Sequence, residues 1–198
     1  MLLYDHKIMV KTEIITLGGL PGSGKSTVKR LLVEALGYQS FSTGDYARNL
    51  AVERGLSLEE FNTLIAHDKS IDLHIDKEQT RIGRDENHFI IDSILGFHFI
   101  PHSFKVHLSV PIEVSAQRIF DDKHSALRVA SHDSPDTYEA TLEKTRRRIE
   151  NHKMRYLEHY GIHIYDETNF DLVIDTSALT PLAVAVQVVD AYRKWLTG

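Results

Sequence analysis

Short apolar runs alternate with segments of helical spacing along most of this chain. Five of these runs have the length and the β-branched or aromatic content that are typical of buried strands. They span residues 14–17, 38–42, 88–92, 105–110 and 171–175. Each is followed by a segment with helical periodicity, which is the arrangement that joins parallel strands. The pattern therefore predicts an α/β fold, with a parallel sheet covered by helices on both faces.

The helical segments carry recognisable start and stop signals. Between residues 26 and 36 the apolar positions recur at helical spacing, and Gly37 is suited to end that helix. Ser57 and Glu60 have the spacing of a capping box. Near the C-terminus, Thr180 and Pro181 suit the N-cap and first turn of a closing helix, whose apolar face we expect in the core.

Two connections are longer than a simple crossover requires. About 45 residues separate the second and third expected strands, and they include a helical pattern over residues 70–83. Later, a polar segment over residues 123–137 leads into a long helix rich in lysine and arginine. We expect the first connection to bind a ligand or to form a helical insertion.

Composition narrows the class of protein. The 198 residues are 42% hydrophobic and 26% charged, carry a net charge of −5 and include no cysteine. These values are typical of one globular domain, which we place over residues 1–198. The acidic balance disfavours a nucleic-acid partner, and no apolar run is long enough to cross a bilayer. We therefore expect a cytoplasmic protein with no membrane partner.

The clearest chemical pattern is the glycine-rich segment at residues 19–26, which fits G-x-x-x-x-G-K-[ST]. It lies between an expected strand and an expected helix, as a phosphate-binding loop does. Glycines allow successive backbone N–H groups to surround a phosphate, the lysine adds a charge, and the serine hydroxyl suits Mg²⁺. The motif predicts that the phosphates of a nucleotide and Mg²⁺ are the ligands. The expected nucleotide contacts are Gly19, Pro21, Gly22, Ser23, Gly24, Lys25, Ser26 and Thr27.

An acidic residue, Asp92, ends the third expected strand. In parallel sheets the carboxyl ends of the strands face the ligand crevice, so this carboxylate is expected beside the phosphate-binding loop. Together with Ser26 it is a candidate ligand for Mg²⁺. The alternative is that Asp92 only caps the segment that follows.

Beyond these motifs, the chain resembles the nucleoside monophosphate kinases, and among them the short, archaeal-type cytidylate kinases. The resemblance covers essentially the whole chain after residue 12. It is carried by the phosphate-binding loop, by Phe-Ser-Thr-Gly-Asp at residues 41–45 with Arg48 downstream, by residues 53–61, by Arg155-Tyr156 and Tyr160-Gly161-Ile162, and by residues 171–177.

The resemblance implies a three-layer P-loop NTPase fold with a five-stranded parallel sheet. The core would comprise residues 12–37, 87–118 and 156–198, with an acceptor-binding insertion at residues 38–86 and a lid at residues 119–150. It also implies small-molecule nucleotide substrates and ATP-dependent transfer to an acceptor such as CMP or dCMP. Thr43, Asp45 and Arg48 would hold that acceptor. The catalytic set would be Lys25, Asp92, Arg118, Arg146 and Arg148, with Arg118 near the donor and the last two on the lid.

Two positions depart from the family pattern. No arginine follows Asp92, where kinases of this type hold the acceptor phosphate, and Glu150 stands where a lid arginine is expected. Arg81 or Arg84 would have to substitute if the acceptor is a cytidylate.

Two other interpretations remain open. One is a kinase for a hydroxyl acceptor such as shikimate, gluconate or dephospho-coenzyme A, in which Asp45 or Asp92 would act as general base. The other is a regulatory protein that binds ATP without turnover.

Overall fold

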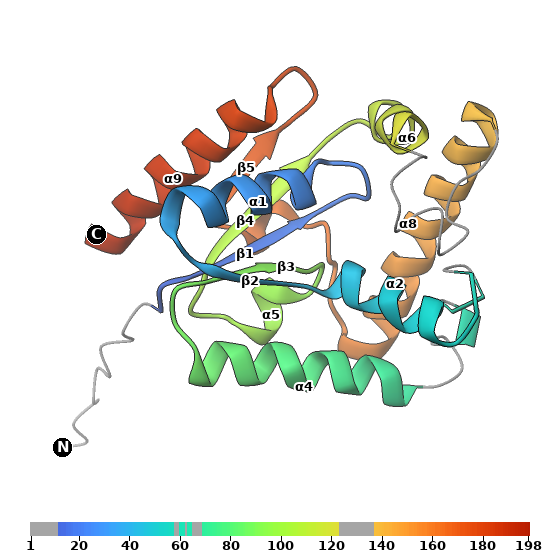
Figure 1. Ribbon diagram of the computed structural model, residues 1–198, viewed down its shortest axis with the longest axis horizontal. Helices are drawn as coiled ribbons and strands as arrows, with labels where there is room; N and C mark the ends of the chain where they lie inside the picture. Colours follow the sequence, from blue (N-terminus) through green and yellow to red (C-terminus); the bar gives the residue numbers. More distant parts are fainter. Residues whose placement is uncertain (1–11, 58–59, 62, 65–68, 123–136) are drawn as a thin grey trace.

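The computed structural model describes residues 12–57, 60–61, 63–64, 69–122 and 137–198. At its centre is a parallel sheet with the strand order β2-β3-β1-β4-β5 (Figure 1). The strands are β1 (Ile14–Gly19), β2 (Gln39–Ser42), β3 (Phe89–Asp92), β4 (Phe104–Ser109) and β5 (Leu172–Asp175). All five lie close to their expected bounds, and the predicted α/β sheet is confirmed.

Helices cover both faces of the sheet (Figure 1). On one face lie α1 (Lys25–Leu36) and α9 (Pro181–Thr197), whose residues Val28, Leu32, Val184 and Val188 are buried against the apolar side chains of the sheet. On the other face, α4 (Lys69–Asp85) and α5 (Gly96–Phe99) enclose a second cluster that includes Ile82. This is the three-layer arrangement that the resemblance implied.

Three further helices surround the carboxyl ends of the strands: α2 (Thr43–Glu53), α6 (Ile112–Asp121) and α8 (Tyr138–Tyr160). A short 3₁₀ helix, η1 (Glu167–Asn169), precedes β5. Side chains cap α2 and α8, because Ser42 accepts from the Asp45 N–H at the start of α2, and Thr137 accepts from the Ala140 N–H at the start of α8.

The long connection between β2 and β3 has a small core of its own. Ala51 of α2, Phe61 and Ile75 of α4 are all buried against one another. The expected insertion is therefore packed, and it lies beside the carboxyl end of the sheet. Residues 123–136 of the expected lid fall outside the described residues. Of the rest, residues 119–122 form the end of α6 and its C-cap, and residues 137–150 form the N-cap and first part of α8, which runs without a break through the expected boundary at residue 150.

Strand order brings the two main motifs together. β1 lies between β3 and β4, and the pairing of β1 with β3 sets Leu17 opposite Asp92. Because the strands are parallel, the loop that follows β1 and the carboxylate that ends β3 emerge at the same edge. No helix in the described part of the chain is both long and apolar enough to cross a membrane.

Deleting a core side chain from α1 should weaken the fold. Leu32→Ala removes a fully buried side chain, so we expect the free energy of unfolding to fall by about 2–5 kcal/mol in a urea titration. Leu182→Ala on α9 is the matched control, because Leu182 is 63% exposed and its loss should change that energy by no more than about 0.5 kcal/mol. Equal losses from both variants would contradict the assignment of this core.

Candidate active site

The glycine-rich loop is packed too tightly for side chains at two of its positions. Gly19 has a φ of +138°, and a Cβ there would lie 2.3 Å from the Leu108 carbonyl oxygen at the end of β4. Gly22 has a φ of +74°, and its Cβ would lie 2.6 Å from the Ser115 carbonyl oxygen of α6. The glycines therefore let the loop pass close to β4 and α6 while it takes left-handed backbone conformations.

The loop ends in the N-terminus of α1. The N-cap residue, Gly24, is left-handed and makes no side-chain capping bond. The first N–H groups of a helix then have no side-chain acceptor, and the helix dipole adds partial positive charge at the same place. This end of α1 is suited to a phosphate.

Lys25 lies inside this loop. Its Nζ donates to the carbonyl oxygens of Gly19 and Leu20, at 3.0 and 2.8 Å. Burial is the main reason that the pKa of Lys25 is lowered to about 8. The charge of Asp92 raises this pKa, and the charges of Arg148 and Arg48 lower it further. The ammonium group is thus poorly solvated, which favours the approach of an anion that would replace its lost hydration.

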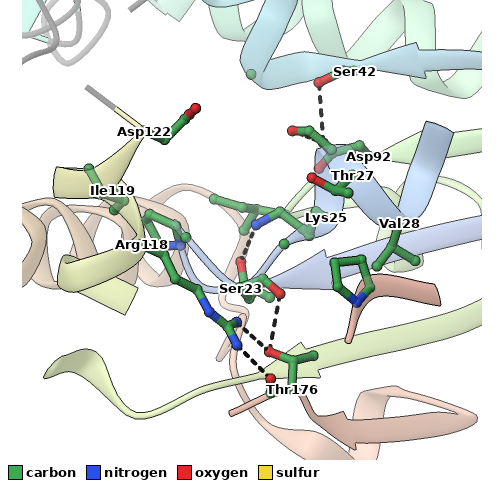
Figure 2. A pocket seen from close by; sticks show the side chains of 18 of the residues that line it. Ser23, Lys25, Thr27, Val28, Ser42, Asp92, Arg118, Ile119, Asp122 and Thr176 are labelled. Atoms are coloured by element: carbon green, nitrogen blue, oxygen red, sulfur yellow. Dashed lines mark hydrogen bonds between the residues drawn. The ribbon is translucent and has the colours of Figure 1, made fainter. Parts of the chain in front are cut away.

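Asp92 is 6% exposed and lies beside two hydroxyl groups. The hydroxyls of Ser26 and Ser42 each donate to its Oδ2 over 3.4 Å, and Figure 2 shows Ser42 aimed at the carboxylate. A carboxylate next to a serine hydroxyl provides the oxygen donors that Mg²⁺ prefers. The two residues that the sequence assigned to the metal are therefore brought together, and their chemistry fits that ion.

Arg118 of α6 is fixed against the other side of the loop. It donates to Thr176 Oγ1 at 3.0 Å and to the Thr176 carbonyl oxygen at 2.6 Å, as Figure 2 shows. The Thr176 hydroxyl in turn lies 3.2 Å from the carbonyl oxygen of Ser23. Ser115 also donates to the Pro21 carbonyl oxygen. These bonds tie the loop to α6 and to the end of β5.

On the opposite side, α2 presents the residues expected to hold an acceptor. Thr43 and Arg48 both line a cavity over the phosphate-binding loop. Asp45 lines neither that cavity nor the smaller one next to it. Asp45 instead bridges two cations, with Lys29 Nζ and Arg48 Nη1 each 3.2 Å from one of its oxygens. Its position makes it a support for Arg48.

These residues surround a cavity of about 430 Å³, which the loop, Asp92 and Arg118 line. A smaller cavity of about 80 Å³ adjoins it, bounded by α2, α4, α8 and the segment after β3. Arg148 lines both cavities. The site therefore has a large compartment over the phosphate-binding loop and a small one beneath the insertion.

The structure shows which of the arginines proposed from the sequence line the two cavities and which do not. Arg146 lines neither cavity; it is half-exposed and lies 3.8 Å from Glu113 of α6. The candidate substitutes for the absent arginine are also elsewhere, since Arg81 pairs with Glu78 and Glu86, and Arg84 pairs with Asp85. The roles assigned to Arg146 and Arg148 stay predictions.

Sequence reasoning missed several residues of the smaller cavity. His152 and Arg155 line it beside Arg148, one and two turns further along the inner side of α8. Their spacing of three and four residues is the pattern that could have found them. Thr176 was also missed, although it follows the carboxyl end of β5, where ligand-facing residues are expected.

Comparison with known proteins agrees with this geometry. The family model described as an AAA domain matches residues 18–144. The cytidylate kinase of Methanococcoides burtonii is 35% identical over 164 residues, which are 83% of this chain and 87% of that protein. The cytidylate kinase of Natronomonas pharaonis is 35% identical over 184 residues, 90% of each chain.

Among solved structures, shikimate kinase from Bacteroides thetaiotaomicron matches with a TM-score of 0.59 at 14% identity, over 91% of this chain and 98% of that one. A likeness at that identity shows a common fold alone. The closer sequence relatives confirm that the chain is a kinase phosphotransferase of the nucleoside monophosphate kinase type. With its AAA-type phosphate-binding loop and this level of identity over most of its length, the chain belongs to the cytidylate kinase family.

Proposed function

We propose that this protein transfers the terminal phosphoryl group of ATP, with Mg²⁺, to CMP or dCMP. The single observation that carries the proposal is that Arg148 lines both cavities. A donor in the large cavity and an acceptor in the small one would meet at this guanidinium group. Both relatives named above, which this chain matches over most of their length, are cytidylate kinases.

The donor side is formed by the loop, Lys25 and Arg118. The loop N–H groups and the N-terminus of α1 would bind the β-phosphate, and Lys25 would leave its two carbonyl partners to contact the transferring phosphoryl group. Ser26 and Asp92 would hold Mg²⁺, which supplies positive charge next to the phosphates when it is bound.

The acceptor side needs cations because a nucleoside monophosphate carries up to two negative charges. Arg48 lies in the large cavity, Arg155 in the small one and Arg148 in both. Ile94, from the segment that carries no arginine, lines both cavities too. We infer that the arginines of α8 replace the absent arginine. They would contact the acceptor phosphate from the side opposite to the segment after β3.

The chemistry requires positioning more than proton transfer. A phosphate oxygen of the acceptor forms a new bond to the γ-phosphorus while the bond from that phosphorus to the bridging oxygen breaks, and ADP leaves. The acceptor oxygen is already ionised at neutral pH, since the second pKa of a phosphate monoester is about 6, so no general base is needed. Asp45, one of the two candidate bases for a hydroxyl acceptor, forms ion pairs with Lys29 and Arg48.

A substrate panel tests the proposal. Purified protein with ATP and Mg²⁺ is given CMP, dCMP, UMP, AMP, shikimate, gluconate and dephospho-coenzyme A, and ADP release is measured by a coupled assay. We expect turnover with CMP or dCMP and none with the hydroxyl acceptors. Turnover of a hydroxyl acceptor alone would overturn the proposal, and so would stabilisation by ATP with no turnover of any acceptor.

Removing the guanidinium that lines both cavities should reduce turnover. We expect Arg148→Met to lower kcat/KM for the acceptor by roughly 100-fold or more, the scale found for arginines that stabilise a transferring phosphoryl group. Arg147→Met is the control, because Arg147 is exposed on the same helix and lines neither cavity. Comparable losses in both variants would show a general effect of charge on α8.

The lowered pKa of Lys25 makes ATP binding depend on pH. Above pH 8 the amine is mostly neutral in the nucleotide-free protein, so the protein must take up a proton when the phosphates bind. Affinity for ATP should therefore fall above pH 8, by up to about tenfold per pH unit. Calorimetry in two buffers of different ionisation enthalpy should detect this proton uptake.

The matched variant for this measurement is Lys25→Arg, whose guanidinium stays charged over the same range. It should bind ATP more weakly but without the extra proton uptake. The same uptake in both proteins would assign the titration to another group.

A further inference from the structure

The smaller cavity is lined by an unusual set of buried polar groups. Asp76 and Gln79 come from α4, and His152 comes from α8. Their side chains are 9%, 1% and 8% exposed. A carboxylate, an amide and an imidazole thus face one small space at the far side of Arg148 from the phosphate-binding loop.

Two of these groups have polar atoms without a hydrogen-bond partner among the described residues. They are Gln79 Oε1 and His152 Nδ1. A buried polar atom that has no partner destabilises the folded protein, so such atoms are uncommon in native structures. Because both belong to residues lining the same cavity, a ligand there that supplies hydrogen-bond partners would explain them together.

Asp76 limits what that ligand can be. The Tyr160 hydroxyl at the end of α8 donates to Asp76 Oδ2 and fixes the carboxylate in place. An ionised carboxylate can only accept hydrogen bonds, whereas a glutamine amide can turn to present either its oxygen or its nitrogen. The cavity therefore has a carboxylate that accepts a hydrogen bond from Tyr160, beside an amide that can present either a donor or an acceptor.

His152 is the third polar group of the cavity. Burial, and then the neighbouring charges of Arg148, Arg155 and Lys25, hold the pKa of His152 well below its usual value. At neutral pH the ring is uncharged and has one donor and one acceptor nitrogen. It can therefore contact a neutral heterocycle without bringing a charge into the cavity.

We propose that Asp76, Gln79 and His152 bind the hydrogen-bonding edge of the acceptor base and select cytosine over uracil. This inference rests on the proposed function. Cytosine carries an exocyclic amine that can donate to Asp76 and Gln79, whereas uracil has a carbonyl oxygen at that position and would face the carboxylate with another acceptor. A single-ring base also suits a cavity of about 80 Å³ better than a purine does.

Steady-state kinetics of the full chain test this assignment with one substitution. Asp76→Asn keeps the size of the side chain but adds an N–H₂ donor. We expect the wild-type protein to favour CMP over UMP by roughly 100-fold or more in kcat/KM, because a buried acceptor is left unpaired by the wrong base. In Asp76→Asn that ratio should fall at least tenfold, with KM for ATP unchanged.

Glu78→Gln is the matched control, since it neutralises a carboxylate on the same helix that pairs with Arg81 and lines neither cavity. Its CMP to UMP ratio should equal that of the wild type.

Gln79→Leu gives a second readout if Asp76→Asn does not fold. It removes an amide whose Oε1 has no partner among the described residues, so we expect KM for CMP to rise at least tenfold while the melting temperature stays the same or increases. A purely structural role for Gln79 would instead lower the melting temperature and leave KM unchanged.

The outcomes separate this inference from the proposed function. Wild-type turnover of CMP and UMP at equal efficiency would overturn the inference and leave the kinase proposal standing. The same holds if Asp76→Asn and Gln79→Leu both keep the wild-type ratio and KM. Failure of the wild-type protein to phosphorylate any nucleoside monophosphate would overturn both.

Discussion

The parallel pairing of β1 with β3 is the constraint on which the site depends. It sets Leu17 opposite Asp92, so the phosphate-binding loop and the buried carboxylate leave the sheet side by side. Neither feature forms a site alone. The loop without the carboxylate lacks the oxygen beside Ser26, and the carboxylate without the loop has no nearby place for a phosphate.

The loop keeps its shape because it is held from both sides. Close packing against Leu108 and Ser115 is possible only because Gly19 and Gly22 have no side chains. On the other side, Arg118 and Thr176 link α6 and the end of β5 to the loop backbone. These contacts restrain the loop backbone, and a restrained loop loses less conformational entropy when it binds a phosphate.

Several parts of this account could be predicted from the sequence. The strands were found because buried parallel strands are continuous apolar runs, and the positions of Lys25, Ser26 and Asp92 followed from motif and strand end alone. The inner side of α8 could not be predicted in the same way. That helix carries charges all round, so hydrophobic periodicity does not show which side faces the site, and only its packing against α6 and α4 separates Arg148 from Arg146.

The long insertion shows the same limit. Its helical pattern and capping box were visible, but the polar residues of α4 that face the small cavity look like any solvated helix face in the sequence. Arg81 and Arg84 seemed equally able to reach the acceptor, yet both pair with acids on or next to their own helix, away from the two cavities. Tertiary contacts at long sequence separation, such as Tyr160 with Asp76, decide which residues of α4 face inward.

The central claim is that the donor nucleotide binds in the large cavity and the acceptor in the small one, so that their phosphates meet at Arg148. Calorimetric titration with a bisubstrate analogue, in which adenosine and cytidine are joined through five phosphates, measures this most directly. If the cavities are donor and acceptor subsites in line, the analogue should bind roughly 100-fold or more tightly than ATP or CMP alone, because the second nucleotide binds at high effective concentration. An affinity no greater than that of ATP would contradict the account.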